Sequence, residues 1–532
     1  MKWMKKALAC LLAASMAVSL VSCGGDTKET VGKTESGDPK TTEGATPEKV
    51  DSVAADKIIV EITADPGDMN PWNQNSVSML RVREVCYETL AKPVGAEIVP
   101  CLAESWDWLD ETHLQLNLRK GVKFHNGDEM KAEDCLFSLE SAKDSPGFAR
   151  NVKNILFDQC EIKDDYTLVL AYSGPSIFYM NDLVRVAITS KAAYEADPDQ
   201  MTGKPIGTGP YQLTDWVLGS SLTFEKFDGY WDEGEQNVDT IVYRVITEAT
   251  QRTIELETGG VDFLYDVPSS DLERLEANEG FVLDSASTTR TAALYFNCSE
   301  NSVCQDANLR KAICYAIDTE AVAAVGYRGY GEPAYSTITP DNDEWSESLK
   351  QDGVLYAHDV EKAKEYLAAA GYADGVTINL IVDEDAQRNA AVLVVQSCLA
   401  EVGITMNIVS YESAVFQTTL LDEKGGWDIL INNFKADGTI MILFNNQFDN
   451  RSGDRTFIHN EEMQALVEEG VKYGDPEVLE KLLKMFEEDL IPMYCMVNMK
   501  EYYAYKKGIE NFTVNRSTVK PGGFVYTEEF KK

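Results

Sequence analysis

The sequence is poor in histidine and in positive charge, and both shortages limit what the protein can do. It has four histidines, and 48 Lys and Arg residues stand against 88 Asp and Glu residues, which gives a formal net charge of −40. A surface of this sign repels phosphate groups, so we expect no nucleic-acid partner. It also argues against docking by charge on an anionic membrane.

The usual motifs of hydrolases and metal sites are missing as well. There is no His-Glu-x-x-His, no Gly-x-Ser-x-Gly and no Cys-x-x-Cys, and the histidines stand far apart at His113, His125, His358 and His459. We therefore expect no catalytic residues, no metal and no cofactor. Paired carboxylates could still lie among the many acidic residues, which leaves a secreted hydrolase as the alternative of a different class.

Long apolar runs are absent apart from one at the N-terminus, from Ala7 to Val21, which follows Lys2, Lys5 and Lys6. At about 15 residues it is shorter than the roughly 20 that span a bilayer. A basic start, a short apolar core and small residues at a cut site indicate a signal peptide over residues 1–22. The ending Ser22-Cys23-Gly24 resembles the lipobox of bacterial lipoproteins. That resemblance implies lipid on Cys23 and a protein anchored to the cell membrane, outside the cytoplasm.

An uncleaved anchor or a soluble exported protein remain alternatives to the lipoprotein. Residues 23–55 lack aromatic side chains and are rich in Gly, Thr, Glu, Lys and Ser. Such a segment cannot bury enough apolar surface to fold and is expected to be a flexible tether.

Nine cysteines follow the tether, and an odd number cannot all pair within one chain. Most of them stand in apolar segments, where a free thiol packs as a small hydrophobic side chain. We therefore expect mostly free thiols. The nine are Cys86, Cys101, Cys135, Cys160, Cys298, Cys304, Cys314, Cys398 and Cys495.

Strand and helix patterns alternate along the rest of the chain, which is typical of open α/β layers. Helices are expected over residues 77–90, 131–143, 360–370 and 386–402, the last two ended by Gly371 and Gly403. Strands are expected over residues 58–62, 112–118, 166–170, 222–227, 240–246, 377–382 and 405–409. A chain of this length exceeds a single core, so two or three domains are expected.

A series of short motifs, in this order and spacing, resembles the extracellular solute-binding proteins of family 5, the receptors of peptide, nickel and related ATP-driven importers. The motifs are Pro100-Cys101-Leu102-Ala103-Glu104-Ser105-Trp106, Phe124-His125-Asn126-Gly127-Asp128, Gly207-Thr208-Gly209-Pro210-Tyr211, Leu309-Arg310-Lys311-Ala312-Ile313 and Ala370-Gly371-Tyr372. We interpret the second and third motifs as structural turns, because Asn and Gly suit turns and the third has no phosphate-loop continuation.

The resemblance implies an α/β fold of the bilobal periplasmic-binding-protein type (type II, cluster C), with an extra subdomain in lobe one and two hinge strands. Lobe one is expected over residues 57–292 plus 499–532, its subdomain over 99–204, and lobe two over 293–498. The chain is expected to cross between lobes near Ala292–Phe296 and near Tyr494–Asn498. A monomer is expected.

The resemblance also implies a ligand held between the lobes as an added β-strand. In peptide-binding members an aspartate after a strand ending in aromatic-x-Ala-Asp accepts the ligand ammonium, and Phe434-Lys435-Ala436-Asp437 matches it. A helix cap or a solvated loop is the alternative role for Asp437. The other residues expected at the ligand are Asn75, Val77, Tyr265, Asp266, Asn433, Phe434, Lys435 and Tyr494, for each of which core packing or capping is an alternative.

The sequence departs from the family directly after Asp437, where Gly438-Thr439-Ile440-Met441 replaces the usual aromatic residue and acidic-Pro pair. This difference puts a peptide ligand in question, and Lys435 points to a ligand with an additional acidic group. The expected function is capture of an oligopeptide or dipeptide and its delivery to the permease subunits of an importer. A nickel chelate, haem or an oligosaccharide (through Trp72, Trp427 and Phe434) is the alternative cargo, and a sensing lipoprotein without an importer is a further alternative.

Overall fold

The computed structural model describes residues 57–73, 76–94, 97–232, 236–265, 267–346, 355–436, 438–448 and 454–510, with three short strands at 514–515, 518–519 and 525–526. The expected signal peptide, the tether, Cys23, Asn75, Asp266 and Asp437 lie outside these residues. Within the described part, no helix combines the length and apolar character needed to cross a bilayer.

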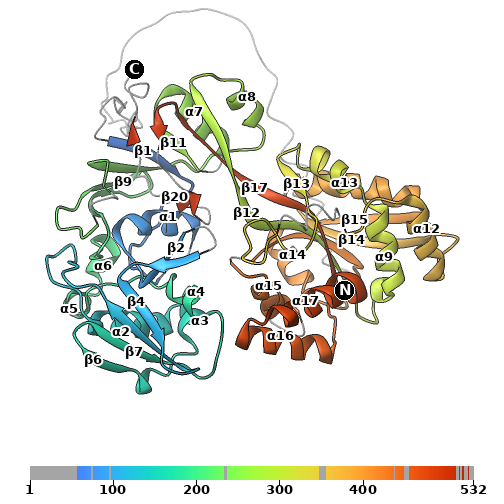
Figure 1. Ribbon diagram of the computed structural model, residues 1–532. Helices are drawn as coiled ribbons and strands as arrows, with labels where there is room; N and C mark the ends of the chain where they lie inside the picture. Colours follow the sequence, from blue (N-terminus) through green and yellow to red (C-terminus); the bar gives the residue numbers. More distant parts are fainter. Residues whose placement is uncertain are drawn as a thin grey trace, which may run out of the picture. The chain divides into compact units, whose positions relative to one another are not determined.

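One eleven-stranded sheet runs through the described chain, in the order β15-β14-β16-β12-β17-β11-β1-β10-β9-β8, with β13 paired to β17. Its strands are β1 (Lys57–Ile62), β8 (Tyr211–Val217), β9 (Ser221–Lys226), β10 (Thr240–Val245), β11 (Phe263–Leu264), β12 (Phe281–Phe296), β13 (Gly331–Pro333), β14 (Val376–Asp383), β15 (Ile404–Tyr411), β16 (Ile429–Lys435) and β17 (Met493–Lys506). The N-terminal half of the sheet (β1 and β8–β11) and the C-terminal half (β13–β16) are joined by the long strands β12 and β17 (Figure 1).

Helices accompany both halves of the sheet. They are α1 (Val77–Cys86), α2 (Ala132–Ser141), α3 (Ala149–Val152), α4 (Tyr179–Leu183), α5 (Lys191–Ala196), α6 (Gln200–Gly203), α7 (Ala249–Thr258), α8 (Leu272–Glu276), α9 (Ala307–Ala316), α10 (Thr319–Ala321), α12 (Val360–Ala369), α13 (Ala386–Glu401), α14 (Ser413–Thr419), α15 (Met441–Gln447), α16 (Glu461–Tyr473) and α17 (Pro476–Lys484). Two π-helical segments, Val322–Gly326 and Met485–Leu490, follow α10 and α17.

A second, four-stranded sheet lies within the N-terminal half of the chain and has its own hydrophobic core. Its order is β4-β5-β7-β6, with β4 at Ala103–Trp108, β5 at His113–Leu118, β6 at Glu161–Asp164 and β7 at Thr167–Ala171. The remaining pairs are β2 (Ala91–Val94) with β3 (Glu97–Pro100), β18 (Ile509–Glu510) with β21 (Val525–Tyr526), and β19 (Val514–Asn515) with β20 (Thr518–Val519).

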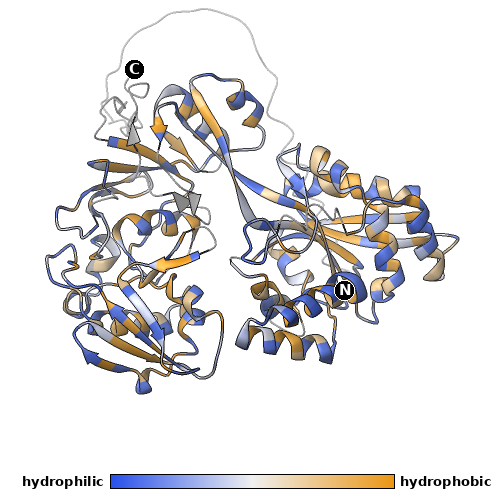
Figure 2. Cartoon of the chain, viewed as in Figure 1, coloured by the Kyte–Doolittle hydropathy of each residue, from blue (hydrophilic) through white to orange (hydrophobic). Residues whose placement is uncertain are grey.

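The core follows the two-residue period of the strands. On β12, Leu294 and Phe296 pack into one buried cluster with α9, α12 and α13, whereas Tyr295 packs into another on the opposite face with α14–α17. On β1, Ile58 and Val60 likewise join one cluster and Ile59 another. In Figure 2 apolar colour follows the strands, while the surrounding helices alternate between apolar and polar residues. Because successive side chains point to opposite faces, each half of the sheet has a core on both sides.

Most of the expected elements are confirmed, and the helix expected over residues 77–90 is too long. Helix α1 ends at Cys86, and Tyr87 is extended, with a φ of −122°. The reason is a close approach of the Gly207–Gly209 turn, whose Gly209 N donates to Cys86 O at 3.1 Å. A Cβ on Gly209 would lie 2.6 Å from the Cys86 carbonyl carbon, so the turn requires glycine there. The nine cysteines after the tether are all free, which confirms the expectation of free thiols.

His125 holds the same turn from the other side. Its Nδ1 accepts from Gly207 N at 3.4 Å, and its Nε2 donates to Gly209 O at 2.9 Å. Only the neutral ring can accept at one nitrogen and donate at the other. Burial lowers the pKa of His125 to about 4, in agreement with this geometry. His125 therefore joins the two glycine-containing motifs as a structural residue.

We predict that His125 makes the fold sensitive to acid. The unfolded chain takes up a proton near the ordinary histidine pKa of 6.5, whereas the folded chain does so only near 4. The contribution of His125 to the free energy of unfolding is therefore fully present above about pH 7. It is lost as the pH drops through this window, by about 2 kcal/mol at about pH 5. Urea unfolding of the wild type and of His125→Gln at both pH values should show that the variant lacks this part of the loss. Equal losses in the two proteins would refute the assignment.

Candidate functional site

Strand β16 has one fully paired edge and one edge that is paired only at its start. Along β12 its register runs from Ile429 opposite Phe296 to Lys435 opposite Arg290. Along β14 the register covers only Ile429 and Leu430. From residue 431 to residue 435, therefore, no described strand pairs with this outer edge.

Backbone hydrogen bonds show which groups point to the outer edge of β16. Phe296 N donates to Pro492 O, so Phe296 faces β17, and the alternation of an antiparallel ladder directs residues 291, 293 and 295 toward β16. Their partners 434, 432 and 430 face β12, and Ala436 N donates to Thr289 O in keeping with this alternation. The backbone of Asn433 and Lys435 consequently points to the outer edge, where an extended ligand could add as a strand.

The segment just beyond β16 is held by a side chain from another part of the chain. Asn342 is buried, and its Nδ2 donates to Ala436 O at 2.7 Å and to Gly438 O at 2.8 Å. Asn342 and Gly438 also form an isolated parallel bridge. The backbone on both sides of position 437 is therefore fixed relative to the end of β16.

Buried polar side chains gather where β12, β16 and β17 lie side by side. Thr291 is fully buried, and its Oγ1 donates to Asn498 Oδ1 at 3.1 Å. Asn432 accepts from Asn433 N at 2.8 Å. Buried amides and hydroxyls in the middle of apolar strands destabilise a fold unless they are hydrogen-bonded. A cluster of them therefore indicates a site that uses polar groups rather than a part of the apolar core. The pattern of the sequence did not single out Thr291 or Asn498.

Asn433 is the member of this group whose bonding is incomplete. Its side-chain oxygen Oδ1 is buried and has no hydrogen-bond partner in the described structure. A buried amide oxygen without a donor costs on the order of 1–3 kcal/mol. A donor from a ligand at the outer edge of β16 would remove that cost.

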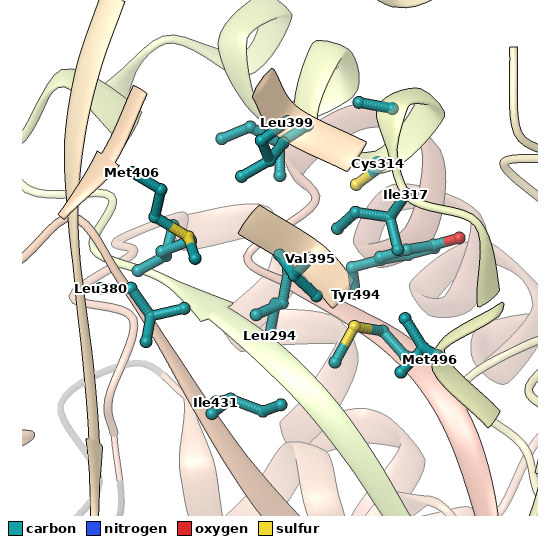
Figure 3. Close-up of a cluster of buried hydrophobic side chains, with 14 of the residues drawn as sticks. Leu294, Cys314, Ile317, Leu380, Val395, Leu399, Met406, Ile431, Tyr494 and Met496 are labelled. Carbon is teal, nitrogen blue, oxygen red and sulfur yellow. The ribbon is translucent and has the colours of Figure 1, made fainter. Parts of the chain in front are cut away.

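Two aromatic residues expected near the ligand are core residues. Phe434 is 3% exposed and packs with Trp427 and Phe444. Tyr494 is 5% exposed and lies among the side chains of the cluster around Leu294 (Figure 3). Its hydroxyl donates to Tyr356 O at 3.3 Å, and burial raises the pKa of this hydroxyl well above its usual range. Trp72, Trp427 and Phe434 are buried, which removes the exposed ring faces that a sugar would stack on.

The expected residues of the N-terminal half form a second group. Val77 begins α1 and is half exposed, next to Ser76, which caps the helix by accepting from Met79 N. Tyr265 is buried after β11, with the guanidinium of Arg81 from α1 lying 4.1 Å from its ring centroid. The structure therefore brings Asn433, Phe434 and Lys435 together on β16, and links Tyr265 to α1 separately.

A buried charge in the N-terminal half was missed by the analysis of the sequence. Glu61 near the end of β1 is fully buried; Arg252 Nη1 lies 3.5 Å from its Oε1, and Tyr265 N donates to its Oε2 at 3.4 Å. Its strand partners β10 and β11 are parallel to β1, and ligand sites of α/β sheets lie at the carboxyl ends of such strands. A single glutamate within the apolar run 58–62 was the available signal.

The described residues contain no group of three or more His, Cys, Asp or Glu side chains placed to hold a metal ion. What the geometry offers instead is a strand edge, buried amides and hydroxyls, and cations at the end of β16. Groups of these kinds can form hydrogen bonds and ion pairs with a ligand.

Comparison with known proteins agrees with this arrangement. Glutathione-binding protein GsiB of Salmonella choleraesuis is 25% identical over 491 residues, which cover 88% of this chain and 94% of GsiB. The substrate-binding protein CtaP of Listeria monocytogenes matches with a TM-score of 0.77 at 21% identity, over 87% of this chain and 98% of CtaP. DppA of Helicobacter pylori, solved in complex with a peptide, matches with a TM-score of 0.68 at 23% identity, over 89% of this chain and 98% of DppA.

These matches confirm the expected α/β bilobal fold of type II periplasmic binding proteins. Residues 97–453 match the bacterial extracellular solute-binding proteins, family 5. Members of this family and the matched relatives are binding proteins of transporters rather than enzymes. The chain therefore belongs to the bacterial extracellular solute-binding proteins of family 5, which serve ABC transporters.

Proposed function

We propose that the protein captures peptides outside the cytoplasm, holds them along the outer edge of β16, and passes them intact to the permease subunits of an ABC importer. The observation that carries the proposal is the edge itself. Asn433 and Lys435 direct backbone groups to a side of β16 that no described strand covers beyond Leu430. Pairing with a backbone gives affinity without reading side chains, which suits a receptor for peptides of varied sequence.

The proposed anchor for the peptide ammonium is Asp437, two residues beyond the end of β16. Its position lies outside the described residues, and the proposal rests on the sequence Phe434-Lys435-Ala436-Asp437 and on the fixed backbone at its neighbours. A carboxylate that leaves water needs a cationic partner, and an ammonium can supply one. Asn75, Val77, Tyr265 and Asp266 are proposed to contact the ligand from lobe one, and Tyr494 is proposed to form part of an apolar wall for the ligand.

Binding is proposed to close two lobes about β12 and β17, with lobe one over residues 57–292 and 499–532, its subdomain over 99–204, and lobe two over 293–498. The ladder between these strands has register shifts between Ser287 and Thr291 and between Ala292 and Ala293. Ladder irregularities let strands bend, and a ligand that touches both lobes favours the closed state.

The names of the relatives support this cargo. GsiB binds glutathione and the solved DppA holds a peptide, and both cargoes carry amide bonds and carboxylates. Cys23 is proposed to hold the protein at the membrane through lipid, and residues 23–55 to act as a tether of roughly 30 Å root-mean-square reach. We propose that the protein works as a monomer.

Native mass spectrometry tests the proposal as a whole. The protein mixed with alanine tripeptides should gain the mass of one intact peptide, and the peptide should be recovered uncut after denaturation. Recovery of fragments, or no gain in mass with any peptide, would contradict peptide capture.

For the anchor, we predict that Asp437→Ala weakens peptide binding by about 2–5 kcal/mol, because the ammonium loses a buried carboxylate. Isothermal titration calorimetry measures the change. Asp374→Ala removes an exposed aspartate in the turn before β14 and serves as the matched control, with an unchanged dissociation constant. If both variants bind as the wild type does, Asp437 is not the anchor.

For the lipid, we predict that Cys23→Ser moves the protein from the membrane fraction to the soluble fraction, because only a thiol accepts the diacylglyceryl group. Fractionation of cells after an alkaline wash gives the result. A serine variant that still sediments with membranes would show that another segment anchors the protein.

A further inference from the structure

The ladder between β12 and β16 ends on a pair of like charges. Arg290 is the register partner of Lys435, and these two residues form the last pair of the ladder. Directly opposed residues of an antiparallel pair share a face and lie close together, and like charges there are destabilising. The pair is also unusual in a chain with 88 acidic and 48 basic residues.

The side chain of Arg290 is exposed, and it forms no ion pair with a carboxylate of the described residues. Lys435 is half-buried and already interacts with groups around it. The guanidinium of Arg290 is therefore the group available for an anion, and its planar fork matches a carboxylate.

The face that carries this pair changes character along the strands. Leu294 opposite Ile431 belongs to the core, Ala292 opposite Asn433 follows, and Arg290 opposite Lys435 comes last. Asn433 thus stands between the apolar core and the cations, and its Oδ1 is buried without a partner in the described structure. This order of groups along the face suits a ligand that brings an N–H donor to Asn433 and a negative charge to Arg290.

We propose that the site selects anionic peptides, with a ligand carboxylate bound by Arg290 next to Lys435 and a ligand amide N–H donated to Asn433 Oδ1. This inference rests on the proposed peptide capture and names the class of peptide. The carboxylate is either an acidic side chain or the C-terminal carboxylate, which share the same chemistry. A carboxylate forms charge-assisted hydrogen bonds with the Arg290 guanidinium, and these are stronger than the bonds of a neutral group of the same shape.

The test compares matched peptides by calorimetry on the full chain. Glutamate is placed at each position of an alanine tripeptide in turn, with glutamine at the same position as the neutral match. Tri-alanine with a free and with an amidated C-terminus forms the second comparison. If a side-chain carboxylate binds Arg290, one glutamate peptide binds about tenfold more tightly than its glutamine match. If the C-terminal carboxylate binds, amidation weakens binding about tenfold instead.

The variant Arg290→Gln should reduce whichever preference is found to within about twofold, and leave binding of the neutral match nearly unchanged. Arg150→Gln removes the same charge from an exposed site on α3 and should keep the preference. Thermal unfolding of both variants verifies that they fold.

Two failures are distinguishable. If peptides bind but neither comparison differs between the wild type and Arg290→Gln, the anionic selectivity is refuted and peptide capture stands. If no peptide of the series binds to the wild type, peptide capture itself fails, and the selectivity proposed here fails with it.

Discussion

The antiparallel ladder between β12 and β17 is the constraint on which the rest of the structure depends. Phe281 and Leu283 at one end of β12 pack with the N-terminal half of the sheet, whereas Leu294 and Tyr295 at the other end are buried in the C-terminal half. Both cores therefore share the same two strands. The ladder is interrupted between Ser287 and Thr291, beside the buried polar cluster, so the regular pairing of the two strands breaks next to the proposed site.

The periodicity of apolar residues predicted most of the helices and strands, because local sequence patterns decide where these elements form. Helices α12 and α13 end two residues before the glycines that the sequence indicated, and Gly371 and Gly403 have φ values of 88° and 90° that other residues rarely adopt. The end of α1 could not be predicted in this way. It depends on Gly209, more than a hundred residues away, whose amide bonds the Cys86 carbonyl.

The candidate site was harder to predict than the fold. The sequence identified β16, but strand register decides which of its side chains enter the core, and this register placed Phe434 inside and Arg290 opposite Lys435. Glu61 was missed because one charge in an apolar run has no periodic signature. Its surroundings are set by residues that other elements bring next to it, among them Arg252 and Tyr265.

The fit between the Gly207–Gly209 turn and α1 has a consequence for how the receptor can diversify. The Cys86 and Val85 backbone leaves no room for a methyl group on Gly209. A bulkier residue in the turn would displace the helix that presents Val77 and Arg81. The proposed contact of Val77 with the cargo thus depends on positions that never touch the cargo, and a screen limited to the proposed contact residues would overlook them.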